Sequence, residues 1–186
     1  MLDKVIAFDQ RLFVFLNTLG STTYDGFWEF ITNFVNWTPL FLLLLVVIYK
    51  KIGAKQTLIL LLVVGAMVAF TDQFTNLIKH SVQRLRPCNT ESLKGIIRVV
   101  IHRDSFSFFS GHAANTMAVT VFVYLQFKRQ LPQLKFLFLW PLVFAYSRIY
   151  LGLHFPLDIL AGFAFGSCSG FAFFKLYGWA KTRYSF

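Results

Sequence analysis

The sequence predicts an all-α fold, a single domain over residues 1–186 that crosses a membrane as a helical bundle. Hydrophobic residues fill 56% of the positions and charged residues only 14%, whereas soluble domains carry about 25% charged residues. The mean hydropathy is +0.60, which also excludes a disordered chain. Five apolar runs are long enough to cross a bilayer, and none alternates as a β-strand does.

These five runs are the predicted spans, because lipid offers the backbone no hydrogen-bonding partner and a helix satisfies its own polar groups. They cover residues 27–49, 56–78, 111–127, 134–150 and 156–177. In the fifth run, Gly162, Gly166 and Gly170 repeat every four residues. Such a ridge of small residues predicts that another helix packs closely against this span.

The N-terminal segment, residues 1–20, is predicted to be an amphipathic helix that lies in the membrane interface. Over residues 2–19, apolar side chains fall on one side of a helical wheel and polar side chains on the other, with Asp9 as the exception. A sixth, tilted span is the alternative interpretation.

Basic residues between the spans indicate the orientation. With five spans, three basic clusters share one face, which holds 9 of the 18 Lys and Arg residues and none of the 8 acidic residues. The clusters are Lys50, Lys51 and Lys55; Lys128, Arg129 and Lys135; and Lys175, Lys181 and Arg183. The opposite face holds the other nine, but three of those belong to the motifs described below. The positive-inside rule places the clustered face in the cytoplasm, which predicts a multi-pass protein of the cytoplasmic (inner) membrane.

Four helix ends on the opposite, periplasmic or extracellular, side carry a set of polar and charged residues, which are costly in a membrane and indicate function. The set is Lys79, Arg86, Ser110, Gly111, His112, Arg148, His154 and Asp158. Three cations without matching carboxylates favour a multivalent anion. Ser110 and Gly111 open a helix whose free N–H groups can bind such an anion. A bound phosphoryl group accounts for the set.

Two histidines in this set suit phosphoryl chemistry. Asp158 follows His154 by four residues, so it can accept a hydrogen bond from one ring nitrogen and leave the other as a nucleophile. His112, on a different helix, can protonate a departing oxygen.

The motifs Lys79-x6-Arg86-Pro87, Ser110-Gly111-His112 and Ser147-Arg148-x5-His154-x3-Asp158 resemble, in order and spacing, the signatures of the type 2 phosphatidic acid phosphatase (PAP2) superfamily. They span residues 79–158. The resemblance implies a metal-independent phosphoric ester hydrolase in which His154 becomes phosphorylated, Asp158 orients it and His112 is the acid. It also implies that Lys79, Arg86, Ser110, Gly111 and Arg148 bind the phosphate. Phe109 stands where the family has proline before Ser-Gly-His.

The resemblance leaves the substrate open among four lipids: undecaprenyl diphosphate, phosphatidylglycerophosphate, phosphatidic acid and lipid A phosphate. The expected partners are this lipid and the bilayer. No nucleic acid is expected despite the net charge of +10, because the basic residues lie at membrane edges. The sequence leaves the oligomeric state open.

Three other functions use the same residues or a similar membrane fold. A zinc site of His112, His154 and Asp158 would place a dication beside three cations, so no metal or cofactor is expected. Vanadium-dependent haloperoxidases share the motifs but are larger and soluble. A non-catalytic lipid-phosphate binding or transport protein is the non-enzyme alternative, although the chain has no internal repeat.

Polar residues outside the motifs receive structural roles. His80 and His102 are assigned to the solvated loop, and Asp72, with Asn76, is expected to face the bundle interior. Four basic residues make the outer loop basic, and they are expected to form a solvated loop against anionic headgroups, with the alternative that some of them hold a second phosphate. They are Arg84, Lys94, Arg98 and Arg103.

Overall fold

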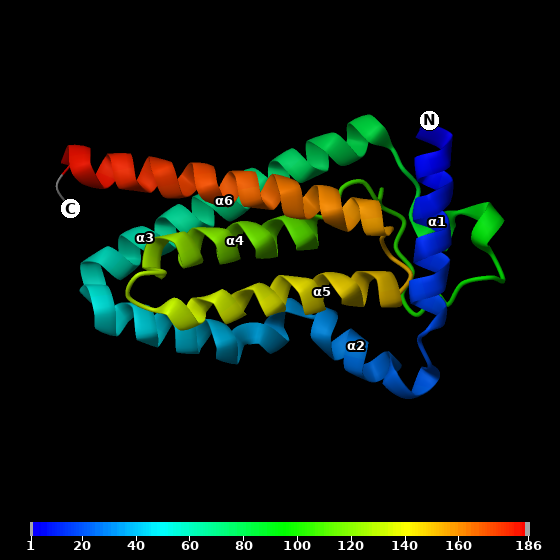
Figure 1. Ribbon diagram of the computed structural model, residues 1–186, viewed down its shortest axis with the longest axis horizontal. Helices are drawn as coiled ribbons and strands as arrows, with labels where there is room; N and C mark the ends of the chain where they lie inside the picture. Colours follow the sequence, from blue (N-terminus) through cyan, green and yellow to red (C-terminus); the bar gives the residue numbers. More distant parts are fainter. Residues whose placement is uncertain (1, 185–186) are drawn as a thin grey trace.

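The computed structural model describes residues 2–184, and all regular structure in this part of the chain is helical, as predicted (Figure 1). The α-helices are α1 (Leu2–Thr18), α2 (Asp25–Thr32), α3 (Thr38–Val82), α4 (Gly111–Phe127), α5 (Leu139–Tyr150) and α6 (Pro156–Tyr184). The 3-10 helices are η1 (Thr22–Tyr24), η2 (Phe34–Trp37), η3 (Pro87–Asn89), η4 (Glu91–Leu93) and η5 (Pro132–Phe138). Helices α3 to α6 form a bundle, and α1 crosses one end of it (Figure 1).

Helix α3 consists of two arms that meet at Gly53 (Figure 1). The φ and ψ angles of Gly53 are 77° and 174°, a conformation that glycine adopts because it has no Cβ atom. The second arm restarts at once, and Thr57 donates its hydroxyl to the Gly53 carbonyl at 2.7 Å. The break therefore lies between the first two predicted spans, where the sequence predicts a connection.

The first predicted span, residues 27–49, is wrong at its start, because the helix is interrupted at Asn33. The backbone there is extended (φ −82°, ψ 116°), and the Asn33 side chain accepts a hydrogen bond from the Val35 N–H at 3.1 Å. This cap begins the short η2 helix, and Pro39 then occupies the first turn of α3. Residues 25–32 consequently form the separate helix α2.

Two segments of the described chain are long and apolar enough, by length and composition, to cross a membrane. They are Phe34–Leu93, which includes both arms of α3, and Pro156–Tyr184. Helices α4 and α5 have 17 and 12 residues, against a range of about 17–25 for a span. The count of five spans therefore stays a prediction.

The glycine ridge of α6 packs against α4, which confirms the close approach that the sequence predicts. A Cβ atom on Gly162 would lie 3.0 Å from the Cβ of Ala113, and one on Gly166 would collide with the backbone of Ala114. Because the two backbones approach so closely, the first turns of α4 and α6 lie side by side at the same end of the bundle (Figure 1).

Asp72 is exposed, so the expectation that it faces the bundle interior is wrong. Thr71 and Thr75 occupy the buried face of this arm, and their hydroxyls donate to carbonyls four residues earlier at 2.8 and 2.7 Å. Successive residues are turned by about 100° around a helix, so burial of Thr71 directs Asp72 outward. There the Asn76 amide donates to it at 3.3 Å. Helix α3 also runs four residues past the predicted end, which places the exposed His80 in its last turn.

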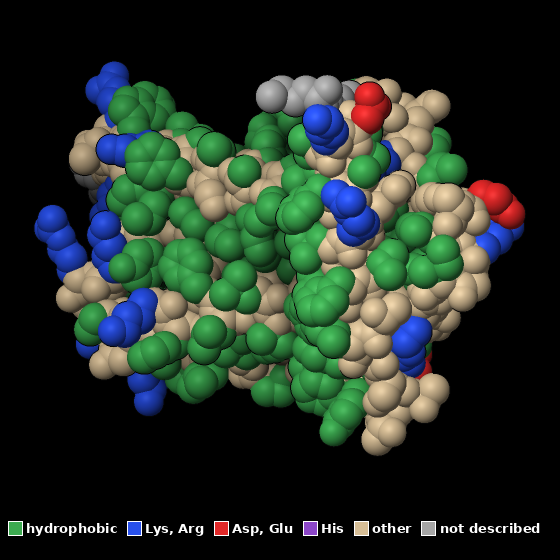
Figure 2. Space-filling view, turned by 45° about the vertical axis from the view of Figure 1, so that its right-hand side comes forward, with side chains coloured by type: hydrophobic (Ala, Val, Ile, Leu, Met, Phe, Trp, Pro, Cys, Tyr) green, Lys and Arg blue, Asp and Glu red, His purple; other side chains and the backbone are tan. Residues whose placement is uncertain are grey.

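The two ends of the bundle differ in character. The end with the bend of α3, the connection from α4 to α5 and the last turns of α6 carries many Lys and Arg side chains (left in Figure 2). The opposite end carries α1 and the long connection of residues 83–110 (Figure 1). The three predicted basic clusters therefore lie together, away from the motifs.

Helix α1 packs on the bundle through one mixed face. Asp9, Phe13 and Asn17 are almost completely buried, and Asn17 donates its amide to the carbonyls of Ile149 and Tyr150 at 3.1 and 3.0 Å. Large apolar side chains, such as Phe8 and Phe15, remain exposed. The segment is helical, as predicted, but its protein-facing side is the one that carries the exceptional Asp9, and its amphipathic character stays a prediction. Its place in the membrane interface stays a prediction.

Candidate active site

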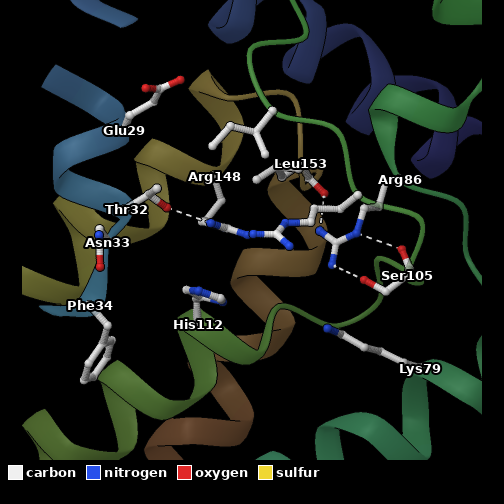
Figure 3. Close-up of a pocket in the computed structure, with 12 residues that line it drawn as sticks. Glu29, Thr32, Asn33, Phe34, Lys79, Arg86, Ser105, His112, Arg148 and Leu153 are labelled. Atoms are coloured by element: carbon white, nitrogen blue, oxygen red, sulfur yellow. Dashed lines mark hydrogen bonds between the residues drawn. The ribbon is translucent and has the colours of Figure 1, made fainter. Parts of the chain in front are cut away.

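A cavity of about 770 Å³ opens at the end of the bundle opposite the basic clusters. Its wall combines residues from α2, α3, α4, α5 and the long connection (Figure 3). The lining residues are Glu29, Thr32, Asn33, Phe34, Lys79, Arg86, Ile101, Arg103, Ser105, His112, Arg148 and Leu153. Four predicted site residues are therefore brought to one cavity from four separate parts of the chain.

Three of these four residues are cations that we call the unpaired cations: Lys79, Arg86 and Arg148. Figure 3 shows Arg148 extending across the cavity toward Arg86, and Lys79 reaching in from α3. Within residues 2–184, none of the three forms an ion pair with a carboxylate. The carboxylate on the cavity wall, Glu29, is exposed. Burying charge without a counter-charge is costly, so the cavity is suited to a multivalent anion.

Neutral groups position the two arginines. Arg86 donates to the backbone and side-chain oxygens of Ser105 at 2.7 and 3.0 Å and to the Leu153 carbonyl at 2.9 Å. Arg148 donates to the Thr32 hydroxyl at 2.7 Å, while its buried Nε atom has no hydrogen-bond partner. Because these bonds leave some N–H groups unused, both guanidinium groups retain donors for a ligand. Burial also lowers the pKa of Arg86.

His154 lies directly behind Arg86 and is 1% exposed. Its Nε2 atom is 3.1 Å from Nη1 of Arg86. A guanidinium group can only donate, so Nε2 carries a lone pair and the ring proton resides on Nδ1. Burial, followed by the charges of Arg86, Arg148 and Lys79, lowers the pKa of His154 well below its usual value of 6.5. The imidazole is therefore neutral at pH 7, and Nε2, whose lone pair faces Arg86, is the ring nitrogen that can act as a nucleophile when a phosphoryl group is bound at that cation.

Asp158 faces the other side of His154 from the first turn of α6. Its Oδ2 atom lies 3.4 Å from Nδ1 of His154, a nitrogen with no hydrogen-bond partner in this arrangement. The same oxygen accepts hydrogen bonds from the hydroxyl of Ser107 and from the N–H of Phe155. Its Oδ1 atom is 2.6 Å from Nη1 of Arg84. The carboxylate is thus held from three sides in a position to stabilise a charged imidazole ring.

His112 begins α4 and points into the cavity (Figure 3). Its ring stacks on Phe144, with 5.5 Å between the ring centroids and 21° between the planes. One histidine, the half-buried His112, thus lines the cavity, while the buried His154 lies behind Arg86 in the turn between α5 and α6. This arrangement provides separate groups for nucleophilic attack and for proton transfer.

Ser110 and Gly111 contribute to the helix start. The Ser110 hydroxyl accepts a weak bond of 3.4 Å from the Ala113 N–H, as a helix cap, and the Ser110 N–H donates to the Asp158 carbonyl at 2.9 Å. A Cβ atom on Gly111 would lie 3.3 Å from a methyl group of Thr75 on α3. Neither residue is among those that line the cavity, so here they join α4 to α6 and α3.

The four basic loop residues have three kinds of environment, and contact with anionic headgroups stays a prediction. Arg84 and Arg98 are paired with buried or half-buried carboxylates, Lys94 pairs with Glu91 at the surface, and Arg103 lines the cavity. The sequence gives no signal for Ser107 or for the pairing of Arg84. The position of Asp9 on the apolar side of the helical wheel signals that this carboxylate is unusual, but not which cation it pairs with.

The described residues 2–184 contain no cluster of three His, Cys, Asp or Glu side chains suited to a metal. The zinc alternative required His112, His154 and Asp158 to form such a cluster. In this structure the Asp158 carboxylate is engaged by Arg84 and Ser107.

A helical bundle with three unpaired cations and His112 on one cavity, and with His154 behind them, is suited to binding a phosphoryl group. The PAP2 superfamily model matches residues 56–182, and the chain belongs to this superfamily. It is an enzyme of the phosphoric ester hydrolase class.

Relatives agree with this assignment. The chain is 31% identical over 178 residues to lipid A 4'-phosphatase of Bacteroides thetaiotaomicron, covering 94% of this chain and 79% of that protein. It is 29% identical over 181 residues to undecaprenyl-diphosphatase of Sulfolobus acidocaldarius, covering 91% and 78%. The crystal structure of a transmembrane PAP2-type phosphatidylglycerolphosphate phosphatase from Bacillus subtilis shares the fold. Its TM-score is 0.70 at 22% identity, covering 94% of this chain and 87% of that one.

Proposed function

We propose that this enzyme hydrolyses the phosphomonoester or diphosphate of a membrane lipid through a phosphohistidine on His154, without a metal ion. The observation that supports this most is the set of unpaired cations, Lys79, Arg86 and Arg148, on one cavity. The unprotonated Nε2 atom of His154 lies 3.1 Å from one of them. A phosphoryl group bound by the cations would therefore be held within reach of the nucleophile.

In the proposed first step, Nε2 of His154 attacks phosphorus in line, so that a P–N bond forms as the P–O bond to the lipid breaks. The unpaired cations stabilise the negative charge on the equatorial oxygens. His112 gives its proton to the departing oxygen, which requires its protonated form in the substrate complex. Asp158 stabilises the positive charge that develops on the ring of His154.

In the second step, water attacks the phosphohistidine and breaks the P–N bond. His112, left neutral by the first step, accepts a proton from this water. Inorganic phosphate leaves, and both histidines return to their starting states. His112 thus acts as the acid in the first step and as the base in the second.

A hydrocarbon tail has an apolar site next to the polar cavity. A cleft of about 280 Å³ is lined by both arms of α3 together with residues of α4 and α5, and Phe34 lines both this cleft and the polar cavity. The names of the relatives support a lipid substrate, and lipid A phosphate and undecaprenyl diphosphate are the first candidates to test, followed by phosphatidylglycerophosphate and phosphatidic acid. We also propose that the cavity faces the periplasmic or extracellular side of the inner membrane, since the basic clusters lie at the opposite end.

Phosphate release from these four lipids in detergent micelles containing EDTA tests the proposal. We expect release by the wild type and by the control variant His102→Ala, whose imidazole is 59% exposed, and none by His154→Ala. Activity that disappears with EDTA would contradict the metal-free mechanism. Binding of the lipids without any release by the folded wild type would favour the alternative, a non-catalytic binding or transport protein.

A further inference from the structure

Arg84 bridges two buried carboxylates that come from opposite ends of the sequence. Its Nη2 atom lies 2.6 Å from Oδ2 of Asp9 on α1, and its Nη1 atom lies 2.6 Å from Oδ1 of Asp158 on α6. The two carboxylates are 1% and 0% exposed, and the Arg84 side chain 20%. Its guanidinium carbon also lies 4.2 Å from the centroid of the Phe155 ring. Aromatic stacking and two ion pairs thus fix this side chain on three sides.

Asp9 has a second link to the same place. Its Oδ1 atom accepts a hydrogen bond of 2.9 Å from the Leu157 N–H, which is one of the unpaired donors in the first turn of α6. Asp158 is the next residue of that turn. Asp9 therefore holds Asp158 in two ways. It binds the backbone of the preceding residue, and it shares Arg84 with the Asp158 carboxylate.

The charges of this bridge also matter to His154. Asp9, Arg84 and Asp158 together carry one negative charge, directed at a ring that must become positive when its Nε2 atom is phosphorylated. The other charged groups that face this ring, Arg86, Arg148 and Lys79, are all cations. Without Asp9, Arg84 would neutralise Asp158, and nothing would offset those cations.

We propose that Asp9 and Arg84 are positioning residues, which hold the Asp158 carboxylate at Nδ1 of His154 and keep the bridge negatively charged. Helix α1 is thereby a part of the active site. Asp9 lies outside residues 56–182, the region that matches the family model, and neither residue belongs to the three motifs. This inference rests on the proposed phosphohistidine mechanism.

Steady-state and single-turnover kinetics in micelles, on whichever of the four lipids the wild type hydrolyses fastest, test the inference. We expect Arg84→Gln and Asp9→Asn each to lower kcat by about tenfold, with KM within about twofold, because the phosphate-binding cations are untouched. Arg84→Lys should recover part of the loss, since an ammonium group retains the charge but does not bridge both carboxylates.

A double-mutant cycle separates positioning from general stability. If Arg84 acts through Asp158, Arg84→Gln has little further effect on kcat in the Asp158→Asn background. The control is Arg98→Gln, which breaks a similar ion pair of 2.7 Å, with Asp25, away from His154, and which should leave kcat within about twofold.

The inference is overturned if Arg84→Gln leaves kcat unchanged, or if it lowers kcat by the same factor with and without Asp158. It is also overturned if Arg98→Gln lowers kcat equally, since the loss would then reflect stability. Failure of the mechanism itself is distinguishable, because His154→Ala would in that case retain activity.

Discussion

Two groups of cations at the active-site end differ in their partners. The unpaired cations, Lys79, Arg86 and Arg148, line the cavity and have no carboxylate in ion-pair contact. The paired arginines, Arg84 and Arg98, bind carboxylates of α1, α2 and α6 at 2.6 to 2.7 Å. Arg84 and Arg86 are two residues apart and belong to different groups. A carboxylate partner therefore distinguishes the arginines that join helices from the cations that are available to bind a ligand.

The largest loss of activity is expected on substitution of Arg148, one of the unpaired cations. Arg148→Ala removes a buried cation from the site where transition-state charge develops, so we expect kcat/KM to fall by about 10²–10³-fold. Arg148→Lys should restore only part of this, because a lysine lacks the planar fork. Initial rates over a range of lipid concentrations measure both variants. If kcat/KM falls by less than about tenfold in Arg148→Ala, Arg148 does not bind the phosphate in the transition state.

The unpaired cations should also set the pH dependence. Because burial and these cations lower the pKa of His154 below 6.5, its nucleophilic form persists as the pH falls to 6.5 and is lost only below that folded-state pKa. In Arg86→Gln one of these cations is absent, so the acidic limb of kcat/KM should move to higher pH. A pH profile of both enzymes measures the shift. Movement to lower pH in the variant would contradict this placement of Arg86.

A smaller effect is expected at the polar support of Arg148. Thr32→Val removes the hydroxyl that accepts from Arg148 at 2.7 Å but keeps the shape of the side chain. Since the cation remains in the site, kcat/KM should fall by only about threefold to tenfold, which corresponds to about 1 kcal/mol. Kinetics at a fixed pH determine this, and a loss as large as that of Arg148→Ala would show that Thr32 itself touches the substrate.

The smallest effect on activity is expected for Arg98→Gln. Its ion pair with Asp25 is about one quarter exposed, so we expect a loss of about 1 kcal/mol in the free energy of unfolding and no change in kcat beyond twofold or so. Denaturation in detergent, measured beside kcat, checks both numbers. A large loss of activity with unchanged stability would place Arg98 among the functional cations.

The helices and their periodic features can be predicted from the sequence, but the ion pairs between distant residues cannot. The alternation of helices brings Lys79, His112 and Arg148 to one end, and the structure places all three on one cavity. The glycine spacing in α6 predicts that another helix packs closely against it, and the structure identifies that helix as α4. Arg84 and Asp9 are 75 residues apart, and no pattern along the chain indicates which carboxylate a loop arginine will find.

Two errors have local causes. The first predicted span begins too early because the aromatic residues of α2 look like a continuation of the apolar run, whereas the cap at Asn33 interrupts the helix. The sequence predicts that Asp72 faces the bundle interior, because a charged residue within an apolar span suggests a buried role. The structure buries its neighbours Thr71 and Thr75 instead.

The central claim is that His154 forms a covalent bond to phosphorus, and trapping that intermediate is the most direct test. The wild type would be quenched early in turnover of a lipid labelled with radioactive phosphate, beside His154→Ala and Arg84→Gln. We expect a protein-bound label in the wild type that is stable to alkali and lost in acid, located on the peptide that contains His154, absent from His154→Ala and slower to form in Arg84→Gln. Label in His154→Ala, or release of phosphate by the wild type with no labelled protein under conditions that slow hydrolysis, would contradict the account.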